Sequence, residues 1–173
     1  MPKADDVVHV HPDGRFIRWI DRQTVHREKL VHRSINVLVF HPEDGRMLIQ
    51  RRHREKLTYA GYWDISVAGH VDYSDHPDGD PDADMAAFQL SATRELLEEV
   101  GVEAPLTLVG LYGPKPDVNY EYNALYRCES PGPFTIQEEE VEELRWVNAE
   151  ELQSISPRTR QLDWIAREIL GWT

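Results

Sequence analysis

Alternation of apolar and polar positions along the chain predicts most of its strands. Residues 7–21 hold the apolar run VVHV, a His-Pro-Asp-Gly turn and a second alternating run, which together predict a β-hairpin. A second hairpin is expected from 37–40 and 47–50, which flank the turn Pro-Glu-Asp-Gly. Four further strands are expected at 62–72, 106–112, 120–127 and 144–147.

A central helix is predicted by an apolar period of 3.6 residues that ends at Gly101. Asp80 or Asp82 is expected to cap its first turn. The preceding segment, 75–84, is expected to form an exposed loop because it has five Asp, two Pro and one Gly. A calcium loop is the alternative, but the spacing of its aspartates does not match the EF-hand pattern. The buried stripe of the helix is expected to consist of Met85, Phe88, Ala92 and Leu96.

A last helix is expected to begin with Ser156 as N-cap and Pro157 at its first position, and to end before Gly171. Strands on both sides of a central helix, with another helix at the end, predict an α/β sandwich around a mixed β-sheet. One domain, 1–173, is expected, in which 1–25 forms an N-terminal hairpin of unassigned role. The apolar side of the last helix is expected to be Leu162, Ile165 and Ile169.

Charge and composition narrow the class of ligand. A net charge of -12 argues against a binder of nucleic acid polymers or membrane surfaces, because a polyanion would be repelled over most of the surface. A small anion in a locally basic pocket stays compatible with this charge. No run approaches the ~20 apolar residues that span a bilayer, and Cys128 is the only cysteine, so a cytoplasmic protein is expected. The oligomeric state is left open.

Three carboxylates crowd one turn of the central helix. Glu95, Glu98 and Glu99 occur in RELLEEVGV at relative positions 0, +3 and +4, which places them on one face. Like charges at this spacing repel by a few tenths of a kcal/mol per pair, and a divalent cation would offset the repulsion. Carboxylate oxygens suit Mg²⁺ or Mn²⁺. The alternative is a solvated acidic helix face.

The only concentrated positive charge is RRHREK, residues 51–56, at the end of a predicted core strand. Arg51, Arg52 and Lys56 are therefore candidates to bind a phosphate group. The alternative is a solvated basic loop.

The segment from Gly69 to Val102 resembles the signature of the Nudix hydrolases, which cleave nucleoside diphosphates linked to another group. That signature is Gly, five residues, Glu, seven residues, then Arg-Glu-apolar-any-Glu-Glu-any-Gly-apolar. The second half is matched at every position from Arg94 to Val102. In the first half Asp75 stands where the family has Glu, and 18 residues rather than 7 separate it from Arg94.

The resemblance implies a Nudix-type α/β/α sandwich. It also implies a metal site made by Glu95, Glu98, Glu99 and the Gly69 carbonyl, which an eleven-residue insertion ahead of the helix is expected to leave in place. Asp75 either substitutes for the first glutamate of the signature or has no role. Arg94 is expected to orient the glutamates.

Residues 46–70 are most similar to the isopentenyl-diphosphate isomerase branch of this group. In that branch the residues that match Arg52 and Lys56 hold a diphosphate. The residues that match His32 and His70 bind a metal, and the alternative is two satisfied core histidines. His26 is interpreted as having no functional role.

Two positions separate the chain from an isomerase. Ala68 stands where the isomerases have their catalytic cysteine, and Asn119 replaces one of two paired glutamates, of which Glu121 is retained. Because proton transfer to an isoprenoid carbon loses an essential partner without the thiol, hydrolysis is expected instead.

These features predict metal-dependent hydrolysis of a diphosphate linkage in a small molecule, most simply a nucleoside di- or triphosphate, by a metal-activated water. A glutamate of the helix or Glu140 would act as general base, although Glu138–Glu140 also reads as a solvated acidic loop. An isoprenoid diphosphate isomerase or hydrolase and a non-catalytic nucleotide sensor are the alternatives. Weak candidates for stacking on a nucleobase, with core packing as the alternative, are Trp19, Tyr112, Tyr120 and Tyr122.

Overall fold

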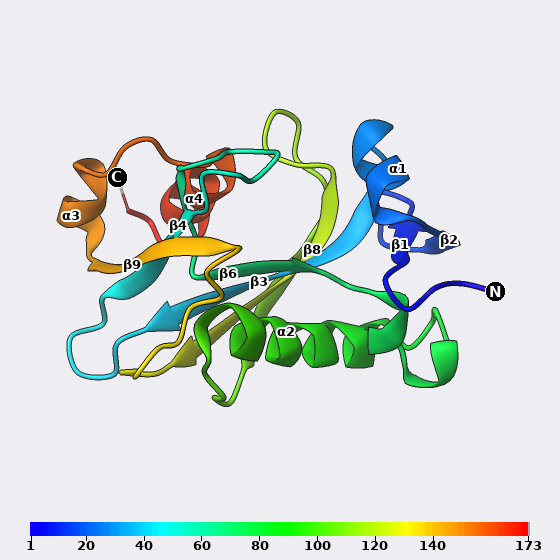
Figure 1. The fold of residues 1–173 in the computed structure, drawn as a ribbon, viewed down its shortest axis with the longest axis horizontal. Coiled ribbons are helices and arrows are strands. Elements are labelled where there is room, and N and C mark those ends of the chain that lie inside the picture. Colours follow the sequence, from blue (N-terminus) through cyan, green and yellow to red (C-terminus); the bar gives the residue numbers. More distant parts are fainter. Residues whose placement is uncertain (173) are drawn as a thin grey trace.

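The computed structural model describes residues 1–172, in which one sheet of nine strands is combined with several helices (Figure 1). The strands are β1 Val7–Val10, β2 Phe16–Ile20, β3 His32–Phe40, β4 Met47–Arg52, β5 Trp63–Asp64, β6 Val67–His70, β7 Thr107–Tyr112, β8 Glu121–Glu129 and β9 Val141–Val147. The helices are α1 Arg22–Arg27, α2 Asp84–Val100, α3 Ala149–Gln153 and α4 Arg160–Trp164, with 3₁₀ turns η1 Tyr73–Asp75 and η2 Pro77–Gly79 and a π-helical turn η3 Ile165–Ile169.

β3 is the central strand of the sheet. It pairs antiparallel with β6 and parallel with β8, which pairs in turn with β7. β4 pairs with β5 and β9 and meets β3 only where Phe40 faces Met47. Because parallel and antiparallel neighbours coexist, the sheet is mixed, which confirms the sequence prediction.

Helices cover both faces of the sheet. α2 runs across one face, and α3 and α4 lie on the other side (Figure 1). Successive side chains of β3 alternate between the two layers: Ile35 and Val37 belong to the cluster that contains Phe88 of α2, whereas Leu38 belongs to the cluster that contains Leu162 of α4. The architecture is the predicted α/β/α sandwich.

β1 and β2 form the predicted N-terminal hairpin at one end of the sheet (Figure 1). The hairpin joins the sheet where His9 pairs with His32. The connection that follows β2 is the short helix α1, which the sequence pattern does not predict, and its Val25 is buried with Val7 and Ile20. α1 is thereby held beside the beginning of β3.

α2 begins later than predicted and has no aspartate cap. Its N-cap is Ala83, which has no side-chain acceptor. Asp80 instead accepts a hydrogen bond from the amide of Asp82 at 2.9 Å, in the turn before the helix, so neither residue is the cap. Met85 is 43% exposed because it lies in a first turn that extends beyond the core cluster, and the buried stripe begins one turn later.

The last helix also begins later than predicted. Its N-cap is Thr159, whose hydroxyl accepts a hydrogen bond from the Leu162 amide at 3.1 Å, and not Ser156. The Pro157 carbonyl accepts from the Trp63 amide at 2.9 Å, and the Thr159 amide donates to the Trp63 carbonyl at 2.8 Å. Because residues 157–159 run alongside β5, the helix cannot start at Pro157.

The insertion before α2 is partly buried, contrary to the exposed loop that its composition predicts. Asp75 and His76 are each 5% exposed. Arg94 donates to both carboxylate oxygens of Asp75 at 3.0 and 2.8 Å, and a guanidinium nitrogen of Arg33 lies 3.3 Å from Nε2 of His76. Two arginines from the body of the molecule therefore draw the start of the insertion inward. None of the helices in residues 1–172 has the length and apolar character that a membrane span needs.

Candidate active site

The three carboxylates of α2 lie together at the side of the helix next to the sheet, as their spacing predicts. Glu95 and Glu99 are 9% and 6% exposed, whereas the side chain of Glu98 is 50% exposed. Burial raises the pKa of Glu95 to about 7 and that of Glu99 to about 8, and the charge of Glu95 adds to the effect on Glu99. Two carboxylates held this way are costly as anions unless a cation joins them.

Gly69 of β6 lies directly against Glu95. A Cβ atom added at Gly69 would stand 2.2 Å from the Glu95 carboxyl carbon, which no side chain tolerates. The main chain of β6 therefore approaches the carboxylates as closely as it does only because residue 69 has no side chain.

Arg94 binds the acidic groups around it. Its guanidinium donates to both oxygens of Asp75, to Glu95 Oε1 at 2.9 Å and to Glu98 Oε2 at 3.1 Å. It also donates to the His70 carbonyl at 3.3 Å, which ties β6 to the helix. The hydrogen bonds that Arg94 donates to Asp75 are the largest cause that raises the pKa of Arg94. This geometry agrees with the expectation that Arg94 orients the glutamates, and it gives Asp75 a partner despite the insertion.

Glu99 has a different kind of partner. Nε2 of Gln50, on β4, donates to Glu99 Oε2 at 2.8 Å. Within residues 1–172, no Lys, Arg or His forms an ion pair with Glu99. Sequence reasoning missed Gln50, although a polar residue at the end of the apolar run MLIQ was a signal that could have found it.

Arg51 and Arg52, the first two basic residues of 51–56, are each held by acidic or carbonyl groups. Arg51 lies 3.2 Å from Glu142 and 3.4 Å from Glu143, on the opposite side of β4 from Gln50. Arg52 donates to the Thr58 carbonyl at 3.2 Å and lies 3.4 Å from an oxygen of Asp64. Carboxylates and a carbonyl thus hold both arginines in place.

Lys56 and Glu140, predicted to bind phosphate and to act as base, form an ion pair with each other. The loop that carries Glu140 is fastened to the end of α2, because the Gln137 amide donates to the Glu99 carbonyl at 3.1 Å. The negative charge of Glu140 is among the causes that raise the pKa of Glu99. The structure therefore brings Glu140 next to the carboxylates of α2.

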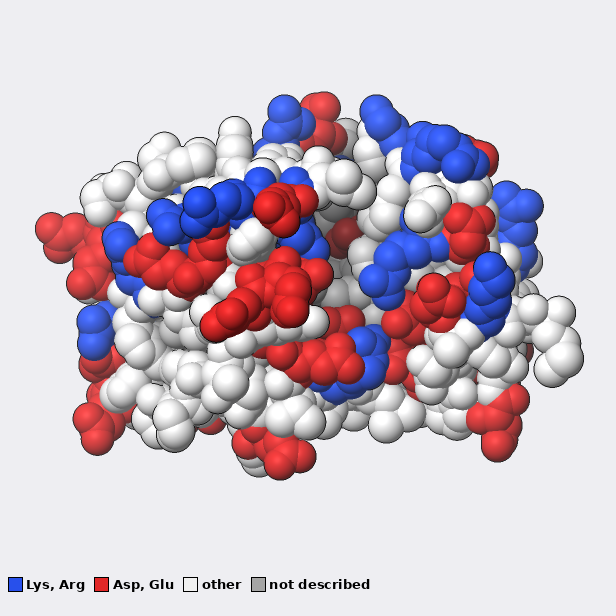
Figure 2. Space-filling model, viewed as in Figure 1, with Lys and Arg blue, Asp and Glu red and all other residues white. Residues whose placement is uncertain are grey.

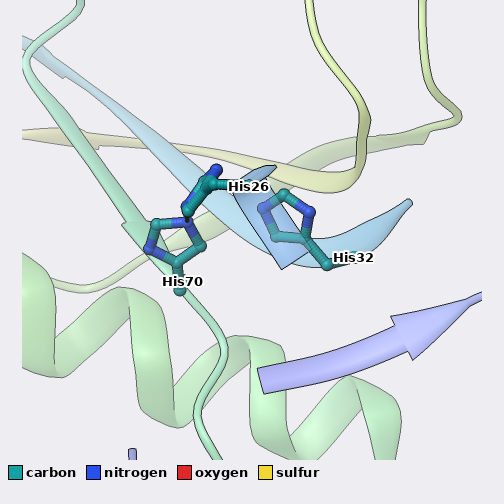
Figure 3. A group of neighbouring side chains, drawn as sticks. All are labelled: His26, His32 and His70. Carbon is teal, nitrogen blue, oxygen red and sulfur yellow. Dashed lines mark hydrogen bonds between the residues drawn. The ribbon is translucent and has the colours of Figure 1, made fainter. Parts of the chain in front are cut away.

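Three histidines converge on the other side of β6 (Figure 3). His26 comes from α1, His32 from β3 and His70 from β6, and one ring nitrogen of each lies within 4.8 Å of the others. Nε2 of His26 and Nε2 of His70 are 2.9 Å apart. His26, which the sequence interpretation left without a role, is thus the third member of the cluster; it lies on the unpredicted helix α1.

The histidine cluster has the donor set of a metal site. Burial lowers the pKa of His26 and of His32, and lowers that of His70 well below its ordinary value, so neutral imidazoles are favoured. His32 Nδ1 is satisfied by the Leu30 carbonyl at 2.9 Å, but its Nε2 is buried without a hydrogen-bond partner. An unpartnered nitrogen that faces two other imidazoles fits a metal ion.

The surface is hollowed above α2, with Lys and Arg side chains at its sides and acidic side chains gathered below it (Figure 2). A basic rim over an acidic floor suits an anionic ligand held through a cation.

Comparison of the sequence with models of known protein families identifies its family. The NUDIX domain model matches residues 30–172. The chain belongs to the Nudix family. Members of this family are hydrolases that generally use divalent metal ions.

Two relatives show where this Nudix chain lies within the family. The Nudix hydrolase YfcD of Salmonella typhi is 32% identical over 144 residues, which cover 83% of this chain and 72% of that protein. The isopentenyl-diphosphate delta-isomerase of Phaffia rhodozyma is 28% identical over 194 residues, which cover 94% of this chain and 74% of that protein. The similarity to hydrolases and to an isomerase confirms the resemblance drawn from residues 46–102.

Two solved structures have the same fold. DR0079 from Deinococcus radiodurans superposes with a TM-score of 0.76 at 18% identity and covers 94% of this chain and 98% of its own. The NUDIX domain of Shewanella oneidensis NrtR, solved with ADP ribose, gives a TM-score of 0.62 at 14% identity, and covers 89% of this chain and 100% of its own.

The Nudix chain keeps Glu121 beside the histidines but turns Asn119 away. The Ser34 hydroxyl donates to Glu121 Oε2 at 3.0 Å, and the Asn123 amide donates to that hydroxyl at 2.8 Å. Asn119 donates to Gln161 at 2.6 Å. The two positions that pair in the isomerases thus have different hydrogen-bond partners here.

The four aromatic candidates for base stacking have separate surroundings. Trp19 packs edge-on against Tyr73. The ring centroids of Tyr122 and Phe88 are 6.3 Å apart, so Trp19 and Tyr122 both lie in packed regions. Tyr112 contacts Trp164, and Tyr120 is 50% exposed. The structure does not gather them into one stacking site.

Proposed function

We propose that the chain hydrolyses a diphosphate linkage in a small molecule, most simply a nucleoside di- or triphosphate, with Mg²⁺ or Mn²⁺. The observation that carries this proposal is the pair of buried carboxylates, Glu95 and Glu99, of which Glu95 packs against the main chain at Gly69. Glu98 and the Gly69 carbonyl would complete the ligands for the ion. When bound, the ion would neutralise charge on the phosphate oxygens and lower the pKa of an attacking water.

The chain's own residues then divide the remaining work. Arg94 holds Glu95 and Glu98 in place through two hydrogen bonds. Lys56 and Arg52 supply positive charge to the phosphate groups, with Arg51 held further away by Glu142. Glu140 accepts the proton of the attacking water once a phosphate group takes its place beside Lys56.

A second metal position at His26, His32 and His70 is part of the proposal. Three neutral imidazoles suit Mn²⁺, Fe²⁺ or Zn²⁺ better than Mg²⁺, which prefers oxygen. Glu121, held by Ser34 and with a charge that acts on His26, is the acidic candidate for a fourth ligand.

A nucleotide is favoured as substrate by two observations. The NrtR domain, which has this fold, was solved with ADP ribose. The strongly acidic chain concentrates its positive charge at 51–56, which suits a small anion and not a nucleic acid polymer or a membrane surface. A cytoplasmic location, where nucleotides are abundant, completes the proposal.

The test is a substrate panel of nucleoside di- and triphosphates, ADP ribose and isopentenyl diphosphate, with Mg²⁺ or Mn²⁺ and with phosphate and pyrophosphate release as readout. Turnover of a nucleotide is expected, and Glu99→Gln is expected to lower it by about 10²–10³-fold. Glu103→Gln, just beyond α2 and exposed, is the matched control and is expected to leave turnover unchanged. Turnover that is insensitive to Glu99→Gln would refute the proposal.

The relationship to the isomerase favours isoprenoid diphosphates as the second candidate substrate class. Release of phosphate from isopentenyl diphosphate alone, or its conversion to the allylic isomer, would establish this alternative. Tight binding of a panel compound without turnover would instead identify a sensor.

A further inference from the structure

Gln50 is the side chain that holds the most deeply buried carboxylate of the glutamate cluster. It is 4% exposed on β4, and its Nε2 donates to Glu99 Oε2 at 2.8 Å and to the Ser66 carbonyl at 3.1 Å. Because both acceptors are oxygens, only the NH₂ group of the amide fits there. Gln50 therefore fixes the direction of Glu99.

The amide is itself held by a hydrogen-bonded frame. Ser66 donates to the Leu48 carbonyl and accepts from the Val39 amide at 2.9 Å, so it joins β3 and β4 next to Gln50. Ser66 is fully buried. A side chain whose partners are buried strand groups loses little freedom when it holds a ligand in place.

The neutrality of Gln50 distinguishes it from Arg94. The guanidinium of Arg94 binds Glu95 and Glu98 and offsets part of their charge. At Glu99 a cationic partner would compete with a divalent ion, and a purely apolar partner would leave the carboxylate without a hydrogen bond. An amide donates a hydrogen bond to the carboxylate and leaves its charge unpaired, as the backbone of Ala68 also does.

We propose that Gln50 is a positioning residue that presents Glu99 to the divalent cation at the glutamate site. This inference rests on the proposed function only in that a cation binds at the glutamates. Gln50 touches no reacting atom and acts through Glu99.

The test measures Mn²⁺ binding to the whole chain without substrate, by electron paramagnetic resonance of free Mn²⁺. The glutamate site is defined as the binding that disappears in Glu99→Gln, which separates it from binding at the histidines. Gln50→Met, which removes the amide at similar volume, is expected to raise the Kd of this site about 10–100-fold. Because binding is weakened and the site is kept, high Mg²⁺ is expected to restore kcat in this variant.

A second variant keeps the proposal testable if Gln50→Met folds poorly. Gln50→Lys would place an ammonium beside Glu99, so its melting temperature is expected to match or exceed that of the wild type while Mn²⁺ binding at the glutamates is lost. Cys128→Ala, a buried change in the core cluster that includes Leu96 and Val100 of α2, is the control for loosened packing and is expected to leave the Kd unchanged.

The outcomes separate this inference from the proposed function. An unchanged Kd in Gln50→Met or Mn²⁺ binding retained in Gln50→Lys would overturn the role of Gln50, and so would a kcat that high Mg²⁺ does not restore in a chain whose wild type turns over a panel compound. A chain that binds Mn²⁺ through Glu99 and Gln50 but hydrolyses nothing in the panel would overturn the proposed function and support this inference.

Discussion

At the scale of single residues, the unusual feature is a pair of buried carboxylates on one turn of α2. Glu95 and Glu99 lie under the sheet with pKa values raised to about 7 and about 8, chiefly by burial. Arg94 offsets part of this burial at Glu95, whereas Gln50 gives Glu99 a hydrogen bond and no charge. A bound cation would therefore stabilise these buried carboxylates more than it would stabilise the carboxylates of a solvated acidic helix face.

The raised pKa values predict how stability depends on pH in metal-free protein. Between the ordinary value of 4.5 and the folded values near 7 and 8, the folded state binds more protons than the unfolded state. The contribution of these two groups to the free energy of unfolding is therefore expected to be largest below pH 4.5 and to decrease as the pH rises from 5 to 8. The slope of the decrease approaches about 1.4 kcal/mol per pH unit for each proton.

Urea unfolding in EDTA at several pH values measures this slope. Glu99→Gln is expected to flatten it, and Mg²⁺ is expected to stabilise the wild type more at pH 8 than at pH 6, because the ion binds the ionised carboxylates. Exposed Glu103→Gln serves as the control. A slope that is the same in Glu99→Gln as in the wild type would contradict the burial argument.

At the scale of elements, Arg33 connects three segments that are distant in sequence. From β3 it donates to the Gly14 carbonyl at 3.1 Å and to the Pro81 carbonyl at 2.8 Å, and it lies 3.3 Å from His76. Arg33 is 2% exposed and forms no ion pair within residues 1–172, so burial lowers its pKa. It fastens both the N-terminal hairpin and the insertion to the central strand.

Arg33→Met is expected to destabilise the chain by about 2–4 kcal/mol, because the Gly14 and Pro81 carbonyls lose a buried donor. Amide hydrogen exchange is expected to increase around Gly14 and in 76–83, which Arg33 contacts. Arg15→Met, which removes an exposed ion pair with Asp13, is the matched control and is expected to change stability by less than about 0.5 kcal/mol. Unchanged exchange in both segments would show that other contacts hold them.

Elements with a strong local signal could be predicted, and those defined by tertiary contacts could not. The hairpin 7–21 has a clear turn, and the second half of α2 has both an apolar stripe and the helix-ending Gly101. α1 and α3 have only six and five residues, too few for an apolar period. β3 extends back to His32 through polar residues that the sheet buries, and such residues do not look like a strand in the sequence.

The same division applies to the candidate site. The helical spacing of Glu95, Glu98 and Glu99 is local, so the sequence predicts their common face. Gln50 and His26 reach the site from β4 and α1, and only the register of the sheet and the packing of α1 bring them there. The side chain of Arg51 lies on the opposite face of β4 from Gln50, next to Glu142. The basic run 51–56 by itself does not show which of its side chains point toward the glutamates.

At the scale of the whole molecule, β6 lies between two groups of candidate ligands. Its Gly69 faces Glu95 on the α2 side, and the next residue, His70, faces the histidine cluster on the other side. The His70 carbonyl accepts hydrogen bonds from Ser91 and Arg94 of α2. One short strand therefore fixes the distance between the two candidate metal positions, and the two positions differ in donor type, oxygen on one side and nitrogen on the other.

This difference predicts that the two positions respond to different ions. In protein freed of metal with EDTA, Zn²⁺ at about 100 times its Kd is expected to add roughly 2.7 kcal/mol of stability, which raises the melting temperature by about 5–10 °C for a chain of this size. His26→Ala is expected to remove that increase, because His26 supplies one of three nitrogens, and to leave the stabilisation by Mg²⁺ intact. Exposed His11→Ala, in the turn of the N-terminal hairpin, is the control. A Zn²⁺ response that His26→Ala leaves unchanged would show that the three rings pack together without binding a metal.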